Sequence, residues 1–552
     1  MTITPTYPGV YIQEIPSGVR TITGVQTSIT AFAGRAPIGP VATPVLIASY
    51  GDYQRTFGGL TSDSSMSYSV RDFFLNGGAQ AVIVRLYHAP SSSTTGGFAQ
   101  VSVAAAAPIP ALVFTAASPG AWGNSLVLQA DTINIPSNSD ISALYGAGLV
   151  QADFFNLTVT QTSPTGAVTT ERFNNLTLKD PSPRRIDRVL AAQSQFVRVT
   201  TTGGAPISAI GTSGMGAAAV AAINGATPPV SFTQGADSSA LVENDYFGGA
   251  GAEAGLPSKT GIYALENTDL FNLLVIPPDV RGQDGQPGTN VLAGALKYAF
   301  NRRAILLVDP PLAWEGGASV VTGGSGLASL GLSGTNTRNA ALYYPHLLEA
   351  DPLRQGQPDL FAPSGAVAGI IAATDAQRGV WKAPAGVDTG IQGIRGLSLR
   401  LTNADSGALN PLGVNALRTF PVSGSVVWGS RTLRGADQLA DDYKYLPVRR
   451  LALYIEESLF RGTQWVVFEP NDTPLWAQIR LNVGSFMNDL FRKGAFAGTS
   501  PRDAFFVKCD AETTTKTDIN NGIVNIVAGF APLKPAEFVI ISIQQLAGQN
   551  AS

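Results

Sequence analysis

KYLPVRRLALYIEESLFRGTQWVVFEPNDTPLWAQIRLNVGSFMNDLFRKG, residues 444–494, carries the clearest secondary-structure signals of this chain. Pro447 suits the first turn of a helix, and apolar residues then recur at helical spacing over 448–459. Gly462 predicts the end of that helix. The aromatic and β-branched residues 464–469 predict that a short strand follows it.

A second helix is predicted in the same stretch. Thr473 predicts its cap, Pro474 its first position and Gly494 its end. Its apolar stripe comprises Trp476, Ile479, Val483, Phe486, Met487 and Leu490, and its opposite face comprises Asn482, Ser485, Asp489 and Arg492. The stretch therefore predicts a helix–strand–helix unit in which no residue is an obvious catalytic group.

The composition combines few charges with many turn-forming residues. Only 14% of the 552 residues are charged, against the usual quarter, and 60 Gly and 36 Pro are present. The length predicts three or four domains. A surface poor in charge suits a protein that buries itself against copies or partners, and a stable Ser/Thr/Gly-rich β protein has the same composition.

Several classes of partner and compartment are excluded by the same data. The net charge of −3 offers no basic surface for nucleic acid. The longest apolar run, near residues 538–543, has the length of a strand, so no direct membrane insertion is expected. The first residues lack the pattern of a secretory signal, and the single cysteine, Cys509, fits synthesis in the cytoplasm.

Catalytic and metal-binding patterns are missing from the sequence. The two histidines, His88 and His346, lie in different predicted domains and at no metal-ligand spacing. Asp309 follows an apolar strand, as a magnesium-holding aspartate does, but the phosphate-binding GxxxxGK[ST] motif is absent. An ordinary strand-end aspartate is therefore the better interpretation, and we expect no catalytic residue, no cofactor and no metal.

Strands and helices alternate over 21–90 and 240–400. The expected strands are 27–40, 81–86, 270–276, 304–308 and 341–344, and the expected helices are 66–76, 291–301 and 366–374. This alternation predicts an α/β layer whose sheet is at least partly parallel.

Residues 91–239 differ from both neighbours because Ser, Thr and Gly dominate there. Short strands are expected at 126–130, 155–161 and 196–201, and a short helix at 184–192. We interpret this part as a mostly-β domain inserted into the flanking fold. Further strands are expected at 397–401, 425–428, 505–509 and 522–527.

Both ends of the chain carry candidate strands without a nearby hairpin partner. The first comprises Val10, Tyr11, Ile12, Gln13, Glu14 and Ile15, and the last comprises Glu537, Phe538, Val539, Ile540, Ile541, Ser542 and Ile543. Such a strand pairs either with a distant strand of its own chain or with the sheet of a neighbouring subunit.

Four segments occur in an order that resembles a known family. They are PGVYIQEIPSG from residue 8, TSITAFAGRAP from 27, DYQRTFGG from 52 and FFLNGGAQAVIVRL from 73. Together with residues 444–494, they resemble the tail sheath proteins of contractile phage tails and related injection systems. The resemblance covers roughly 7–90 and 240–545. Gln13 stands where family members often carry an acidic residue.

The resemblance and the residue patterns together predict an α+β multidomain chain. The expected parts are an N-terminal strand arm (1–20), an α/β core domain (21–90 and 240–400), an inserted mostly-β outer domain (91–239), a C-terminal two-helix and β-sheet inner domain (401–535) and a C-terminal strand arm (536–552). The resemblance implies that the two arms fill open sheet edges of neighbouring copies.

In function, the resemblance implies a structural subunit without enzymatic activity. Such subunits form a helical homo-oligomer around an inner tube protein, meet baseplate and tail-terminator or cap proteins, and contract to drive the tube through a target envelope. After synthesis in the cytoplasm, the chain would join a phage tail or injection-system particle.

The second helix is the candidate surface for the inner tube. Its candidate contact residues are Arg480, Asp489, Arg492 and Lys493, and an ordinary solvated helix face is the alternative. Two other functions remain open for the whole chain. One is an α/β hydrolytic enzyme with an inserted β domain, and the other is a tail tube, capsid or surface-layer subunit.

Overall fold

The computed structural model describes residues 20–103, 111–163, 166–180, 182–201, 207, 214–225, 229–282, 287–323 and 326–542. The predicted strand at 10–15 and residue Ile543 of the last predicted strand lie outside these described residues. Within the described ranges, no helix combines the length and the hydropathy that crossing a bilayer requires.

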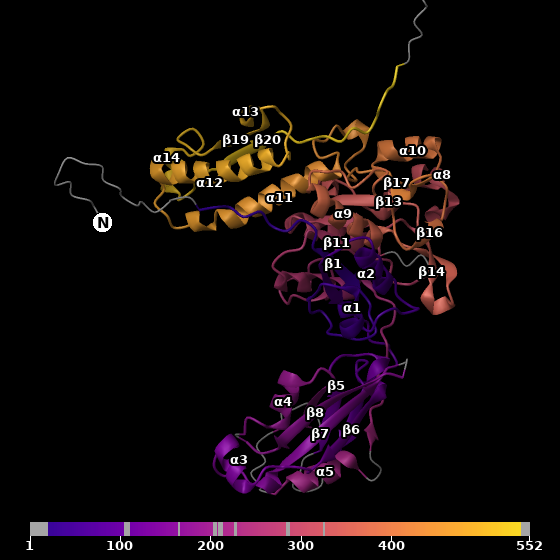
Figure 1. The fold of residues 1–552 in the computed structure, drawn as a ribbon, viewed down its shortest axis with the longest axis vertical. Helices are drawn as coiled ribbons and strands as arrows, with labels where there is room; N and C mark the ends of the chain where they lie inside the picture. The colour runs from indigo at the N-terminus through magenta and orange to yellow at the C-terminus, as the bar shows by residue number, and fades with distance from the viewer. Residues whose placement is uncertain are drawn as a thin grey trace, which may run out of the picture.

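An eight-stranded sheet forms the middle of the molecule (Figure 1). Its spatial order is β18-β17-β13-β12-β11-β1-β3-β2, and only the two outermost strands run antiparallel to their neighbours. The strands are β1 (Thr30–Gly34), β2 (Val45–Ile47), β3 (Ala81–Arg85), β11 (Leu273–Val275), β12 (Ile305–Val308), β13 (Ala340–Tyr344), β17 (Val414–Phe420) and β18 (Gly424–Val427). The expectation of a partly parallel sheet is confirmed.

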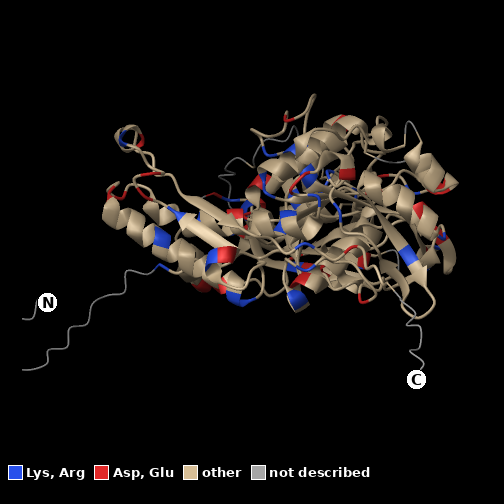
Figure 2. Ribbon diagram, turned by 90° about the horizontal axis from the view of Figure 1, so that it is seen from above, with Lys and Arg blue, Asp and Glu red and all other residues tan. Residues whose placement is uncertain are grey.

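Helices cover both faces of this sheet, which is why its inner strands are continuous apolar runs. One face packs on α1 (Tyr50–Phe57), α2 (Met66–Leu75) and α9 (Ser364–Arg378), and the other packs on α6 (Glu243–Phe247), α7 (Thr289–Asn301), α8 (Ala318–Thr322) and α10 (Asn403–Leu409). Successive residues of a strand enter opposite cores, as Phe32 and Ala33 of β1 do. In Figure 2, acidic and basic residues are interspersed, and most of the ribbon consists of uncharged residues.

Strands β17 and β18 correct the predicted boundary at residue 401. They belong to the central sheet, so residues 401–535 do not form one separate unit. β17 pairs in parallel with β13, and the buried Asn415 amide reinforces the pairing by donating to the carbonyl of Leu342 at 3.0 Å. The expected strand at 397–401 lies earlier, as β16 (Ile394–Leu397), in a small sheet with β14 (Leu347–Asp351) and β15 (Gln357–Phe361).

The outer part of the chain folds around a main core of its own, with a smaller apolar cluster beside α3, at the lower end of Figure 1. Two antiparallel sheets, ordered β10-β6-β7-β8 and β4-β5-β9, enclose that core. The elements are β4 (Gln100–Val103), β5 (Leu112–Ala116), β6 (Leu126–Asp131), α3 (Asn138–Tyr145), β7 (Phe154–Thr162), β8 (Val168–Thr177), α4 (Ile186–Gln193), β9 (Val197–Thr201), α5 (Gly216–Asn224) and β10 (Val230–Ser231).

Arg85 ties this outer part to the central sheet. The side chain, at the end of β3, is fully buried and has no carboxylate against it; its guanidinium donates instead to the carbonyls of Ala36, Gly39 and Pro119 at 2.6–2.7 Å. Burial lowers the pKa of Arg85 to about 10. Because Pro119 belongs to the outer part, this side chain links the two parts across the junction, where the N–H of Gly39 also donates to Ser118 Oγ.

The C-terminal elements form a fourth core, and two of them differ from the prediction. They are α11 (Leu446–Gly462), α12 (Thr473–Arg492), α13 (Pro501–Ala504), β19 (Phe505–Lys508), α14 (Lys516–Asn520) and β20 (Val527–Phe530). The strand expected at 464–469 is wrong: Gln464–Val466 is a 3-10 turn that packs Trp465 and Val466 on the core, and no strand of the described ranges lies beside it. β20 begins where the strand expected at 522–527 should end.

Three further predictions for this region need correction. The cap of α12 is Asp472 rather than Thr473, since its carboxylate accepts from the backbone N–H of Leu475 at 3.0 Å. Asn482, expected on the solvent face, is buried. Residues 537–542 form no strand within the chain, because no other strand of the chain lies beside them among the described residues.

Helix α11 joins the C-terminal core to the central one. Its residues Leu446 and Leu453 pack in the central core, whereas Leu451 and Ile455 pack in the C-terminal core. Arg450 of the same helix makes two hydrogen bonds of 2.6 and 2.8 Å to the Asp375 carboxylate of α9, and both side chains are nearly inaccessible to water. The pair therefore fixes the position of α11 on the central domain.

Replacing Arg450 with Met should destabilise the fold, because it leaves the Asp375 carboxylate buried without its partner. We expect a loss of about 3 to 5 kcal/mol in the free energy of unfolding, measured by urea titration with tryptophan fluorescence. The control is Arg55→Met on the exposed face of α1, where the pair with Asp52 is open to solvent and no measurable change is expected. Equal unfolding midpoints for the two variants would contradict the assigned role of Arg450.

Candidate functional site

The segment that begins at Arg20 lies along α11 and α12, where three backbone contacts hold it. The N–H of Arg20 donates to Asn482 Oδ1 at 3.1 Å, and the N–H of Val25 donates to Ser458 Oγ at 3.2 Å. The carbonyl of Thr27 accepts from Arg450 at 2.8 Å. We call residues 20–28 the N-terminal root; it is the reason that Asn482 is buried, and sequence patterns gave no signal for it.

Two glycines allow the N-terminal root to lie this close to α11. A Cβ atom on Gly24 would lie 1.8 Å from Tyr454 Oη, and one on Gly462 would lie 2.5 Å from Ile22 Cγ2. Gly462 is the last residue of α11, and it is Thr463, not a left-handed glycine, that caps the helix. The predicted helix end at Gly462 is confirmed, but the residue is needed for a different reason, because its lack of a side chain makes room for Ile22.

The start of the C-terminal arm is held by a second set of contacts, which we call the clasp: Asn410, Arg431, Tyr445 and Glu537. The Arg431 guanidinium, 1% exposed, donates to both Glu537 carboxylate oxygens at 2.8 and 2.6 Å. Asn410 and Tyr445 donate to the same carboxylate at 2.7 and 3.0 Å. Burial opposes the charge of Glu537, but these donors outweigh it and lower the pKa of its carboxyl.

The arm leaves the body directly after the clasp, at the upper right of Figure 1. Phe538, Val539, Ile540 and Ile541 are all largely exposed, and Ile540 is 90% exposed. Four consecutive large apolar side chains in water are unfavourable, so their burial requires a surface that the chain itself does not supply.

The sheet of β19 and β20 offers edges to which a strand can add. β19 pairs only with β20 in the described part of the chain, over the register Phe505↔Phe530 to Lys508↔Val527. α12 and the C-terminal core cover one face of this pair, while Phe506 and Val527 stay exposed. Each strand thus has one edge whose backbone groups are open to a further strand.

The candidate tube-facing residues of α12 fall into two groups. Arg480 is half-buried and donates to the carbonyl of Cys509, so it supports the α12–β19 packing. Asp489, Arg492 and Lys493 are exposed, and within the described ranges none of the three has an ion-pair partner. They remain available for contact with another molecule.

The residues that an enzyme would need are separated and paired. His88 lies 3.0 Å from an Asp245 oxygen, and His346 lies 2.6 Å from Glu315 in another region. Asp309 accepts from the N–H and hydroxyl of Ser364 at 2.9 and 2.7 Å, and burial raises its pKa to about 6. Among the residues described, no group of three or more potential ligands converges on a metal position.

The usual ligand crevice of a doubly wound sheet is filled by side chains. The winding direction reverses between β1 and β11, and ligands bind such sheets beyond the strand ends at that point. There, Arg35 Nε donates to Asp279 at 2.6 Å, and its other nitrogens donate to the carbonyls of Ser238 and Asp63. The second Asp279 oxygen accepts from the N–H of Leu241.

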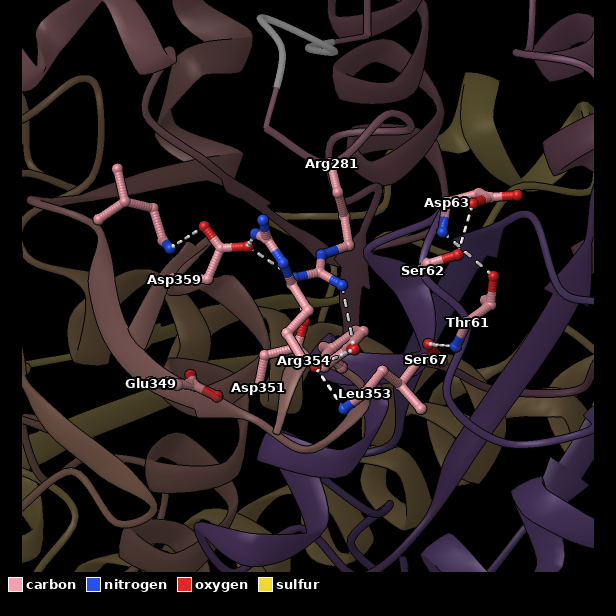
Figure 3. A network of polar contacts seen from close by, with 12 residues as sticks. Thr61, Ser62, Asp63, Ser67, Arg281, Glu349, Asp351, Leu353, Arg354 and Asp359 are labelled. Atoms are coloured by element: carbon pink, nitrogen blue, oxygen red, sulfur yellow. Dashed lines mark hydrogen bonds and ion pairs between the residues drawn. The ribbon is translucent and has the colours of Figure 1, made fainter. Parts of the chain in front are cut away.

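A dense polar network lies between α2 and the β14–β15 hairpin (Figure 3). Arg281 reaches both Asp351 and Asp359 at 2.7 and 2.8 Å, and Arg354 also donates to Asp359. Tyr68 donates to Asp351 at 2.7 Å and lies under the Arg281 guanidinium. Since these members bind one another, with only Arg281 Nε buried and unpaired among them, we interpret the network as a structural link.

Beside this network, two carboxyl groups compete for one cation. Glu349 and Asp72 both contact Arg71, and each has one buried oxygen without a hydrogen-bond partner in the structure. Burial first, and then the neighbouring Asp72 carboxylate, raise the pKa of Glu349 to about 9. Glu349 therefore keeps its proton at neutral pH while Arg71 balances Asp72.

Comparison with known proteins finds two family models in the chain. Residues 289–433 match the model described as phage tail sheath protein central domain, and residues 439–545 match the phage tail sheath C-terminal domain. The tail sheath protein of Vibrio phage KVP40 is 28% identical over 128 residues, which are 23% of this chain. That alignment spans 19% of the length of the phage protein.

Solved structures are similar over nearly the whole chain. The contracted helical sheath of the anti-feeding prophage gives a TM-score of 0.54 at 22% identity, covering 98% of this chain and 100% of that one. The sheath tail protein of Listeria innocua gives 0.55 at 14% identity, covering 93% and 96%. At these identities the similarity shows a shared mixed α/β fold.

Replacing Glu349 with Gln should flatten the pH dependence of stability. The native state holds the Glu349 proton up to about pH 9, whereas the unfolded state releases it near pH 4.5, so unfolding releases a proton between these values. The free energy of unfolding then falls as pH rises, by at most about 1.4 kcal/mol per unit. Between pH 6 and 8, the free energy of unfolding of the wild type should fall by about 1 to 2 kcal/mol more than that of Glu349→Gln, as measured by urea titration. The control Glu243→Gln, at an exposed position, should keep the pH dependence of the wild type. Parallel pH profiles for the wild type and Glu349→Gln would refute this assignment.

Replacing Glu537 with Gln should loosen the arm while leaving the body folded. The neutral amide loses the paired hydrogen bonds to Arg431, so chymotrypsin should cleave after Phe538 about tenfold faster in the monomer. The lowered pKa also predicts that the wild-type clasp is fully formed above the unfolded glutamate pKa and opens only as pH falls through the lower folded value.

Asp437→Asn is the matched control for the clasp, because Asp437 also binds Arg431 at 3.0 Å but lies outside the arm. We expect its arm to be cleaved at the wild-type rate. Equal cleavage of all three proteins would show that Glu537 does not hold the arm.

Proposed function

Because the chain belongs to the tail sheath protein family through its central and C-terminal domains, we propose that it is the structural subunit of a contractile sheath. In this proposal, copies form a helical lattice around an inner tube protein. The subunits then rotate into a wider and shorter lattice and drive the tube through a target envelope. The similarity to the contracted sheath of the anti-feeding prophage supports this function.

The observation that carries the proposal is the match between an anchored, exposed C-terminal arm and an unpaired sheet. Each copy offers two open edges on β19–β20, and residues 537–542 pair with no strand of the described chain. We propose that residues 10–15 of one neighbour and residues 538–543 of another add to these edges as strands. Such head-to-tail contacts generate an open helix rather than a closed pair.

The physical cost of leaving the arms free favours this exchange. Fully burying an aliphatic or aromatic side chain of this size is worth about 1.5 to 3 kcal/mol, and residues 538–541 supply four such side chains. Main-chain hydrogen bonds along the added strand contribute regardless of sequence. Because the added strand alone joins the two subunits in this contact, the subunits can rotate relative to each other while the strand stays paired.

The remaining parts of the subunit take roles consistent with their surfaces. We propose that Asp489, Arg492 and Lys493 of α12 contact the inner tube through exposed charges, which form a contact that can be released. The outer part built on β4–β10 faces away from the tube. Baseplate and terminator proteins meet the ends of the lattice, and the role of the chain is mechanical rather than catalytic.

Deleting residues 1–19 should leave a folded monomer that cannot polymerise. The N-terminal root begins at Arg20 and keeps all of its contacts with α11 and α12, so the unfolding transition should be unchanged. Negative-stain electron microscopy should show striated tubes for the full chain and none for the deletion. Normal tubes from the deleted protein would sink the arm-exchange proposal.

A point variant separates loss of the strand from loss of chain length. Ile541→Asp places a charge in the added strand, and Leu144→Asp places one at another largely exposed apolar position, on α3. Both monomers should be stable, since neither side chain is buried. Only Ile541→Asp should abolish tubes.

A further inference from the structure

A large groove surrounds the clasp at the base of the C-terminal arm. It has a volume of ≈1220 Å³ and lies between α10, β17, the loop that follows α9 and residues 533–539. The clasp closes only one side of it, because Glu537 and Asp437 line the groove while binding Arg431. The rest of the groove is open to a partner.

The charges that line this groove are unbalanced. Two carboxylates, Asp437 and Glu537, are already bound by Arg431, whereas five basic residues line the groove: Arg378, Lys382, Arg418, Lys493 and Lys534. In the described part of the chain, none of these five has a carboxylate partner. Arg418 also has a buried Nε–H without an acceptor. In a chain with 36 basic and 39 acidic residues, this concentration of unpaired positive charge marks a surface for an acidic partner.

The position of the clasp restricts what the partner is. The proposed strand starts one residue after Glu537, and residues 538–542 reach only about 17 Å at about 3.3 Å per residue. A sheet that receives this strand must therefore lie next to the groove. In the proposed lattice that sheet is the β19–β20 pair of the next copy.

The loop that joins those two strands is acidic. Residues 509–526 contain Asp510, Glu512 and Asp518 but only one basic residue, Lys516. Glu512 is largely exposed and lies 3.9 Å from Lys508, too loosely paired to be neutralised. Thr515 caps α14, and its N–H and hydroxyl donate to the Asp518 carboxylate; these hydrogen bonds lower the pKa of the Asp518 carboxyl, which keeps its negative charge.

We propose that the basic groove of one copy receives the acidic 509–526 loop of the next copy in the polymer. This inference rests on the proposed sheath function and gives it a second contact, made by side chains. The arm strand supplies affinity without fixing the angle between two bodies, whereas opposed charges favour one relative orientation and weaken as salt rises.

Cross-linking of assembled wild-type tubes tests the contact directly. A carbodiimide joins a lysine amine to a carboxylate only where the two are in contact, and mass spectrometry identifies the joined peptides. We expect inter-copy links between Lys382 or Lys534 and Asp510 or Glu512. Links from these lysines only to other carboxylates, including those of a co-assembled inner tube protein, would overturn the proposal.

Charge exchange provides the functional readout. K382E/K534E should raise the critical concentration for tube formation by about tenfold, and D510K/E512K should do the same. The four substitutions together should restore the wild-type value, because the pairing is re-created with reversed signs. Lys493 is left unchanged, since it is also a candidate contact for the inner tube.

A matched control and a phosphate comparison complete the test. Lys297 lies on the exposed face of α7, where it pairs with Glu253, and K297E should leave the critical concentration for tube formation unchanged. Failure of the fourfold variant to recover, while wild-type tubes form normally, would refute the groove contact and leave the sheath function intact. If the wild type formed no tubes even with an inner tube protein, the sheath function would fail, and the groove contact with it.

If inorganic phosphate at constant ionic strength shifted assembly of the wild type and K382E/K534E equally, the groove would not be an anion-sensitive surface.

Discussion

The Arg450–Asp375 pair is the interaction on which the rest of the structure depends. Arg450 sits on the helix shared by two cores, binds a carboxylate of the central domain, and also donates to the Thr27 carbonyl of the N-terminal root. One guanidinium thus connects the central domain, the C-terminal domain and the origin of the first arm. A buried arginine with a bidentate partner resists displacement, because moving it exposes an unpaired charge to a low-dielectric interior.

The clasp performs the same task at the other end of the chain. Arg431 is as buried as Arg450, and it holds the last charged residue before the exposed arm. The described ends of the chain leave the body on different sides in both Figure 1 and Figure 2. Tension applied to either arm therefore reaches the eight-stranded sheet through a fixed guanidinium.

The sequence predicted what depends on local pattern and missed what depends on contact across the chain. Continuous apolar runs identified β3, β12 and β13, because parallel strands that are buried on both faces are apolar at successive positions. Gly494 was correctly placed after α12, where its φ of 78° suits glycine. Gly462 was correctly predicted as the last residue of α11, but Asn482 was placed on the wrong face because it binds the N-terminal root, which lies more than 400 residues away in sequence. Arg431 and Glu537 are 106 residues apart, and no periodicity encodes their pairing.

The crevice at the winding reversal between β1 and β11 is filled, so this doubly wound sheet lacks the ligand site that such sheets usually have there. In a doubly wound fold, the strand ends at the winding reversal normally leave space for a ligand. Here Arg35 and Asp279 occupy that space and join the loops after β1 and β11, so the position that would weaken the block is cross-linked instead. A body without an internal hinge at this point can transmit rotation without deforming. In the proposed lattice, the energy for a rearrangement comes from contacts between copies, and we propose such contacts at the unpaired β19–β20 edges, the apolar arm and the basic groove.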